Sequence, residues 1–205
     1  MLTHIRYLVL GVLLIGWTHA LPAQSRLQQW DASGVRAIYT IDAPAFRWHM
    51  KAVDATAYPL FIGAVPASWM VAFYTGNRQD LHLATALLVA EGASFVAVTG
   101  IKHLVRRKRP YRALEGITPR STSADVESPY SFPSGHATAA FTIATVLSLR
   151  YRKWYVVAPA ATWALSVGIS RIWTGMHYPT DVMAGACLGV LIGVLSVKVT
   201  SWLLP

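Results

Sequence analysis

The sequence predicts an all-α fold, an integral membrane helical bundle with five spans that follow a signal peptide. Composition is the first observation behind this prediction, because 54% of the 205 residues are hydrophobic and only 13% are charged. Ordinary soluble domains contain about 25% charged residues. The second observation is that the apolar residues form long runs separated by short polar segments. The third is a net charge of +9, from 18 Lys and Arg against nine Asp and Glu.

Residues 1–23 combine a positive start, a short apolar stretch and small residues near their end. The apolar stretch from Tyr7 to Trp17 is eleven residues long, whereas a membrane span needs about 20. This pattern is typical of a cleaved secretory signal peptide. The alternative is a retained first transmembrane helix, which would raise the number of spans to six. In either case residue 26 starts outside the cytoplasm.

Residues 24–57 mix aromatic and charged side chains. The aromatic and charged residues that alternate here are Trp30, Arg36, Tyr39, Asp42, Phe46, Arg47, Trp48, Lys51 and Asp54. Such a pattern predicts one or two amphipathic helices at the membrane surface. An ordinary solvated linker is the other interpretation. Residues 58–205 then form the membrane-embedded domain.

The five predicted spans follow in order within this domain. They cover residues 58–75, 81–105, 134–149, 154–173 and 179–204. Pro59 and Pro66 lie within the first span, which a membrane helix can tolerate. Glu91 lies near the middle of the second span, where an ionisable side chain is costly and is either functional or satisfied by a neighbouring helix. The third span is short, and its Ala and Thr content suits close packing inside a bundle.

The charges between the spans predict their orientation. If residue 26 is outside, the basic segment from Arg150 to Lys153 falls in a short cytoplasmic loop, as the positive-inside rule expects. Residues 102–120 then lie on the outer face, although they carry seven of the 18 Lys and Arg residues. A basic cluster on this side indicates an anionic partner such as phosphate or anionic lipid. Nucleic acid is not expected, since no nucleic-acid fold signature accompanies the cluster.

Three polar clusters share the outer face, and the first contains Lys102 and Arg109. These cations are seven residues apart, about two helical turns, so both could approach one anion. The alternative for basic side chains here is a rim that contacts lipid headgroups. We assign that rim to Arg106, Arg107, Lys108 and Arg112.

The second cluster, Pro133-Ser134-Gly135-His136, opens the third span. The free N–H groups at a helix N-terminus bind phosphate oxygens, and Gly135 lets the backbone approach closely. Ser134 adds a hydroxyl donor, and His136 lies in the first turn. An ordinary helix cap is the alternative interpretation of the Ser-Gly pair.

The third cluster is the segment from Ser170 to Asp181, which joins the last two spans. Arg171 is a further cation, and Asp181 follows His177 by four residues, so that the two would share a face of a helix. A carboxylate beside an imidazole can select its tautomer and stabilise its protonated form. The alternative is a local hydrogen bond without a catalytic role.

Together the clusters read Lys-x6-Arg-Pro, Pro-Ser-Gly-His and Ser-Arg-x5-His-x3-Asp. This ordered pattern, over residues 102–181, resembles the three-part motif of the type 2 phosphatidic acid phosphatase superfamily. The resemblance implies a membrane enzyme, a hydrolase that removes phosphate from a lipid phosphate or pyrophosphate, with its active site at the non-cytoplasmic face. In a bacterium this would be the inner membrane, with the site facing the periplasm or exterior.

The resemblance also implies a role for each site residue. His177 attacks phosphorus and forms a phosphohistidine, Asp181 orients His177, and His136 acts as general acid and base. The groups that hold the phosphate oxygens are Lys102, Arg109, Ser134, Gly135 and Arg171. The reaction then needs no metal and no other cofactor, since these cations replace a Mg²⁺ clamp.

Several functions remain open at this point. Vanadium-dependent haloperoxidases and soluble acid phosphatases belong to the same superfamily, and a non-catalytic lipid-phosphate binder or transporter is a further alternative. The substrate is open among undecaprenyl pyrophosphate, phosphatidylglycerol phosphate, phosphatidic acid and the lipid A phosphates. The sequence predicts no oligomeric state.

Overall fold

The computed structural model describes residues 26–121 and 129–204, and it is built from helices. Residues 26–39 are helical. The helices that follow are α2 (Pro44–Thr75), α3 (Arg78–Val105), α4 (Pro110–Ala113), α5 (Gly135–Tyr151), α6 (Trp154–Trp173) and α7 (Pro179–Leu203). The prediction of an all-α fold is confirmed. The predicted signal peptide, residues 1–23, lies outside the described residues.

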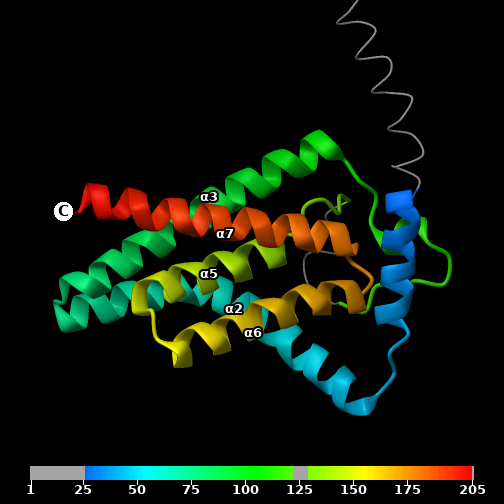
Figure 1. The fold of residues 1–205 in the computed structure, drawn as a ribbon, viewed down its shortest axis with the longest axis horizontal. Helices are drawn as coiled ribbons and strands as arrows, with labels where there is room; N and C mark the ends of the chain where they lie inside the picture. Colours follow the sequence, from blue (N-terminus) through cyan, green and yellow to red (C-terminus); the bar gives the residue numbers. More distant parts are fainter. Residues whose placement is uncertain (1–25, 122–128, 205) are drawn as a thin grey trace, which may run out of the picture.

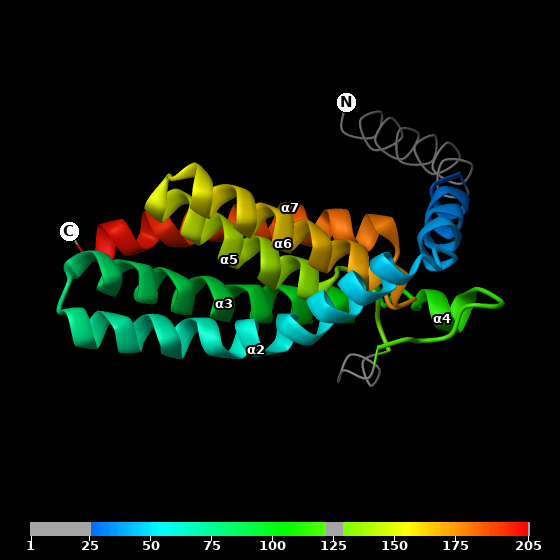
Figure 2. The same cartoon turned by 90° about the horizontal axis from the view of Figure 1, so that it is seen from below.

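The five long helices run side by side along the long axis of the molecule (Figure 1). Helix α5 lies inside this bundle, against α7, α6 and α3. At the end of the bundle opposite the C-terminus, the helix of residues 26–39 runs across the bundle instead of along it, and α4 lies near it (Figures 1 and 2). The C-terminal end of α3 and the N-terminal ends of α5 and α7 meet at this same end.

Four of the described helices, α2, α3, α6 and α7, are long and apolar enough to cross a membrane. The remaining predicted span is α5, which has 17 residues. Its Ala137, Ala140 and Val146 are fully buried, as expected for a helix enclosed by others. The count of five spans stays a prediction.

Helix α2 begins at Pro44, fourteen residues before the predicted start of the first span at Tyr58. Proline is favoured in the first turn of a helix, where its missing N–H costs no hydrogen bond. Met50, Val53 and Ala57 follow at helical spacing and are buried in the bundle. The predicted boundary between the surface segment and the membrane-embedded domain therefore falls inside one continuous helix.

Small residues bring α5 and α7 into close contact. Gly185, Gly189 and Gly193 recur every four residues and thus share one face of α7. A Cβ atom at Gly185 would lie 2.6 Å from the carbonyl oxygen of Ser134, and one at Gly193 would lie 2.8 Å from Cβ of Thr145. Such close approach of helix backbones is typical of membrane helices with small residues at their interface. It places the first turn of α5 beside the start of α7.

Candidate active site

The imidazole of His177 is the centre of the site. It lies just before α7, is fully buried, and its Nδ1 is 2.7 Å from the carbonyl oxygen of Ser131. A carbonyl oxygen can only accept a hydrogen bond, so Nδ1 carries the hydrogen and Nε2 keeps its lone pair. The structure thus selects the tautomer that leaves Nε2 available as a nucleophile.

Ser131 was not predicted as a site residue, since a backbone carbonyl leaves no signature in a sequence. It is held in place by the segment after α3. Its N–H donates to the carbonyl of Arg107 at 2.8 Å, and its hydroxyl donates to the carbonyl of Lys108 at 3.2 Å. The first motif therefore fixes the group that orients His177.

A cation faces the other nitrogen of His177. Arg109 is fully buried, and its Nη1 lies 3.4 Å from Nε2 of His177 and 3.3 Å from the carbonyl oxygen of Met176. Burial lowers the pKa of His177 to about 4, and the charges of Arg109 and Lys102 act in the same direction. His177 is consequently neutral near pH 7, as a nucleophile must be.

Asp181 lies beside His177 but not within hydrogen-bonding distance of it. Its Oδ2 is 3.7 Å from Nδ1 of His177 and accepts the backbone N–H of Tyr178 at 2.8 Å. Its Oδ1 accepts a hydrogen bond from Arg107 at 2.7 Å. The ring of His177 is therefore held by Ser131, while Asp181 contributes a nearby negative charge.

Arg107 departs from expectation. We predicted that it belongs to a rim that contacts lipid headgroups, and this prediction is wrong. Its guanidinium bridges Asp181 and Asp31, at 2.7 Å and 2.6 Å. The sequence could not reveal this, because Asp31 comes from the helix of residues 26–39, hereafter the N-terminal helix, 76 residues earlier in the chain.

Arg171 is buried near the C-terminal end of α6. It forms an ion pair with Asp54 of α2, and its Nε donates to the hydroxyl of Ser170 at 3.4 Å. We did not predict Asp54 as a site residue. Asp54 follows the buried Met50 by one helical turn on α2, but that this face is buried is seen only in the structure.

The second motif caps α5, which was the alternative interpretation of its Ser-Gly pair. The hydroxyl of Ser134 accepts the N–H of Ala137 at 3.4 Å, and the N–H of Ser134 donates to the carbonyl of Asp181 at 3.0 Å. The latter bond ties the second motif to the third. Both Ser134 and His136 are buried.

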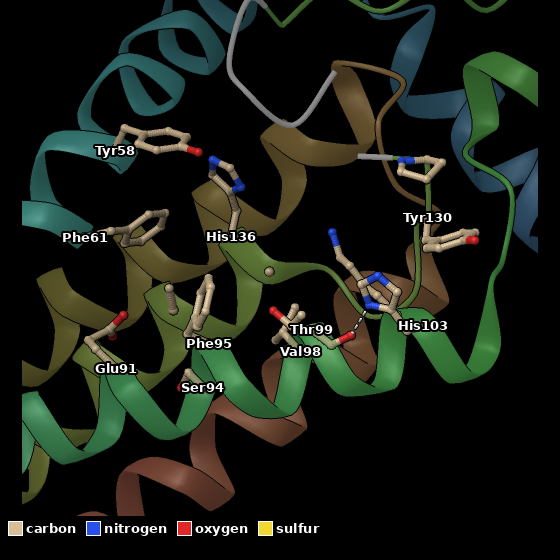
Figure 3. Close-up of a pocket in the computed structure, with 14 residues that line it drawn as sticks. Tyr58, Phe61, Glu91, Ser94, Phe95, Val98, Thr99, His103, Tyr130 and His136 are labelled. Atoms are coloured by element: carbon tan, nitrogen blue, oxygen red, sulfur yellow. Dashed lines mark hydrogen bonds between the residues drawn. The ribbon is translucent and has the colours of Figure 1, made fainter. Parts of the chain in front are cut away.

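A cavity of about 390 Å³ opens between α2, α3 and α5 (Figure 3). Its lining is mostly apolar, but Lys102, Gly135 and His136 line it too. The ring of His136 packs edge-on against Tyr58 and Phe61 of α2, each with 5.4 Å between ring centroids. Its remaining lining residues are Glu91, Ser94, Phe95, Val98, Thr99, His103, Pro129, Tyr130 and Ala139.

The structure places the eight predicted site residues at one end of the bundle, and seven of them form two adjoining groups. The first group surrounds the buried imidazole, and the second lines the cavity. Arg109, Ser134 and Asp181 belong with His177, while Lys102, Gly135 and His136 line the cavity. Arg171 is the remaining predicted residue, and its partner Asp54 extends the site to α2.

In the part of the chain that the structure describes, no three His, Cys, Asp or Glu side chains are placed to hold a metal ion.

Comparison with known proteins decides the family. A model of the PAP2 superfamily matches residues 82–204, which include all three motifs. The chain belongs to the PAP2 superfamily. The resemblance drawn from the motifs is therefore confirmed, and the chain is an integral membrane protein.

Three curated relatives share between 35% and 44% of the aligned residues with this chain. The chain is 44% identical over 138 residues to the bacitracin transport permease protein BcrC of Bacillus licheniformis, covering 65% of this chain and 61% of that protein. It is 35% identical over 137 residues to an undecaprenyl-diphosphatase of Sulfolobus acidocaldarius, covering 67% and 63%. It is 42% identical over 82 residues to the lipid A 1-phosphatase of Porphyromonas gingivalis, covering 38% and 17%. Each alignment thus spans less than two thirds of the relative.

Two solved structures share the fold. The crystal structure of Aquifex aeolicus LpxE superposes with a TM-score of 0.66 at 28% identity, covering 80% of this chain and 92% of that one. The structure of a transmembrane PAP2-type phosphatidylglycerolphosphate phosphatase from Bacillus subtilis superposes with a TM-score of 0.67, covering 95% and 96%. The second is 24% identical, so its likeness concerns the fold alone.

Proposed function

We propose that this protein is a membrane phosphatase that removes phosphate from a lipid phosphate or lipid pyrophosphate through a phosphohistidine on His177. The observation that carries the proposal is the tautomer of His177 and the group that faces its free nitrogen. Its Nδ1 is bound to the carbonyl oxygen of Ser131, and its unprotonated Nε2 faces the buried cation Arg109. This arrangement matches a nucleophile next to an oxyanion site.

The proposed reaction has two steps. In the first, Nε2 of His177 forms a bond to phosphorus while the bond to the leaving oxygen breaks, and His136 gives that oxygen a proton. In the second, His136 takes a proton from water, whose oxygen bonds to phosphorus as the N–P bond breaks. Inorganic phosphate leaves and His177 returns to its neutral form. The negative charge of Asp181, 3.7 Å from Nδ1, stabilises the phosphorylated ring.

The phosphate oxygens carry the charge that develops in these steps, so donors around them lower the barrier. Lys102, Arg109 and Arg171 supply positive charge. Ser134 and the amide of Gly135 supply donors at the start of α5, where the helix dipole favours an anion. Asp54 pairs with Arg171 and sets the position of its guanidinium.

The cavity supports a lipid substrate. It runs along α3 between apolar and aromatic side chains, with His136 facing it from α5 (Figure 3), and Lys102 and His136 both line it. A phosphate bound at these two residues would leave its hydrocarbon chain along this lining. Because two of the relatives are named an undecaprenyl-diphosphatase and a lipid A 1-phosphatase, polyprenyl diphosphates and lipid A phosphates are the first substrates to compare.

The site would face the periplasm or the exterior. The basic loop that contains Arg152 and Lys153 lies between α5 and α6, at the end of the bundle away from His177. Loops with such charge favour the cytoplasm. This supports an outward-facing site.

The test is phosphate release by purified protein in detergent with EDTA present. We expect the wild type to release phosphate from a polyprenyl diphosphate or another lipid phosphate, and His177→Ala to lose detectable turnover. His82→Ala is the control, because this histidine lies near the start of α3, far from the site, and we expect it to retain activity. Substantial turnover by His177→Ala would contradict the nucleophile assignment. Bromination with added vanadate, without phosphate release, would instead identify a haloperoxidase.

A further inference from the structure

Arg107 joins two buried carboxylates from distant parts of the chain. It lies between the end of α3 and Arg109, and its side chain is only 24% exposed. One guanidinium nitrogen is 2.6 Å from Oδ2 of Asp31, and the other is 2.7 Å from Oδ1 of Asp181. Two short charge-assisted hydrogen bonds fix the plane of this guanidinium.

Asp31 connects the N-terminal helix to the first turn of α7. It is fully buried, and besides Arg107 it accepts the N–H and the hydroxyl of Thr180, at 3.0 Å and 2.5 Å. Arg107 also donates to the hydroxyl of Thr180 at 2.7 Å. Because the bonds of such a buried network support one another, removing the charge of Arg107 weakens the bonds that remain.

Arg107 is linked to the nucleophile by two routes. Its carbonyl oxygen accepts the N–H of Ser131, whose own carbonyl accepts Nδ1 of His177. Its guanidinium holds Asp181, which lies 3.7 Å from the same nitrogen. It also lies over the ring of Tyr178, the residue after His177, with 3.9 Å to the ring centroid.

We propose that Arg107 is a positioning residue for His177, and that Asp31 anchors Arg107, so that the N-terminal helix is a working part of the active site. This inference rests on the proposed function of His177 as nucleophile. Arg107 is not among the residues that line the cavity. Its guanidinium is instead occupied by Asp31, Asp181 and Thr180, so its loss should affect the chemical step more than substrate binding.

The first test is the kinetics of Arg107→Gln in the full chain, with a lipid phosphate that the wild type hydrolyses. Misplacing a reacting group by about 1 Å can cost about 10²-fold in rate. We expect kcat to fall by about 10²-fold while KM changes little, and Arg107→Lys, which keeps the charge, to recover part of the loss. Arg106→Gln is the matched control, because this neighbour is exposed and its Nε donates to the carbonyl of His103. We expect it to behave as wild type.

The pH profile is a readout that a purely structural role would not change. His177 is faced by Lys102 and Arg109, which favour its neutral form, and by Asp181, which favours the protonated form. Without Arg107, the negative charge of Asp181 is no longer compensated, and it should raise the pKa of His177. The acid limb of kcat/KM, which requires neutral His177, should therefore move to higher pH. An unchanged kcat and acid limb in Arg107→Gln would overturn the proposal.

A double-mutant cycle with Asp31→Asn and Arg107→Lys keeps the proposal testable if Arg107→Gln does not fold. We expect the two losses in kcat to be strongly non-additive, whereas additive losses would overturn the coupling. His177→Ala in the same assay separates the two hypotheses. Activity in His177→Ala would contradict the proposed function itself, while an inactive His177→Ala beside a fully active Arg107→Gln would contradict only the role of Arg107.

Discussion

At the scale of single residues, the site depends on a histidine that is kept neutral by its surroundings. His177 has no exposed surface, and two cations lie near it. Among the residues that the structure describes, Asp181 is the negative group that favours its protonation, and that carboxylate is already bound by Arg107. Burial of an imidazole disfavours its charged form. The proposed nucleophile therefore needs no separate base to deprotonate it.

This state predicts how stability depends on pH. The pKa of His177 is about 4 in the folded protein, against the ordinary value of 6.5 for a histidine, so between these pH values the unfolded chain binds a proton that the folded protein does not. The free energy of unfolding should therefore fall as pH drops from 6.5 to 4, by on the order of 3 kcal/mol from this group. His177→Gln should lose this part of the pH dependence, which thermal melting in detergent across that range would measure. If the melting temperatures of the two proteins changed with pH by the same amount, the prediction would be contradicted.

At the scale of elements, the interface between α5 and α7 holds the second and third motifs together. A Cβ atom at Gly189 would contact the carbonyl oxygen of Thr138 and lie 3.0 Å from Cβ of Phe141. With a side chain at Gly189, the two helices would have to move apart. The hydrogen bond from the Ser134 N–H to the carbonyl of Asp181 lies at the end of this same interface. The geometry of the site therefore depends also on residues of the α5–α7 interface that do not belong to the site.

Gly189→Ala should accordingly destabilise the protein, by about 1–3 kcal/mol, since overpacking forces the backbones apart. Gly92→Ala is a matched control in another helix, because a Cβ there would have nothing within 4 Å. There the higher helix propensity of alanine should leave stability unchanged or slightly raised. Melting temperatures and phosphate release measure both effects, and equal stability of the two variants would argue against tight α5–α7 packing.

At the scale of the whole molecule, the site lies at one end of the bundle and a basic loop at the other. If the site faces outward, residues near α4 are exposed outside the cell and the loop after α5 is exposed in the cytoplasm. Glu115 and Arg152 represent the two ends, and both are exposed. The orientation therefore predicts opposite accessibility for them.

Cysteine labelling in intact bacterial cells tests this prediction. In a Cys187→Ala background, a membrane-impermeant thiol reagent should modify Glu115→Cys from outside, whereas Arg152→Cys should react only after the cells are opened. Cys187→Ala alone is the control for background labelling, since Cys187 is the single cysteine of the chain. Labelling of Arg152→Cys in intact cells would reverse the proposed topology.

The sequence by itself determined the fold class, the family and the residues of the three motifs. A long apolar run that crosses a membrane forms a helix, because its backbone N–H and C=O groups find no water there and have to bond to each other. The motif residues are local in the chain, so their order and spacing could be compared with those of a known family, and that resemblance implied a phosphate site. His177, Arg109 and His136 could be proposed on these grounds.

Tertiary structure decided which groups surround these residues, because hydrogen bonds between distant segments leave no local pattern. The orientation of His177 depends on a backbone carbonyl, that of Ser131, which lies 46 residues earlier. Asp31 and Asp54 are ordinary acidic residues of an amphipathic segment in the sequence, yet both are bound to arginines of the site. Buried charges need partners, and only packing determines which carboxylate reaches which guanidinium. Packing also decides the role of Arg107. The sequence predicts a lipid contact for this residue, but in the structure it binds Asp31 of the N-terminal helix and Asp181 beside His177.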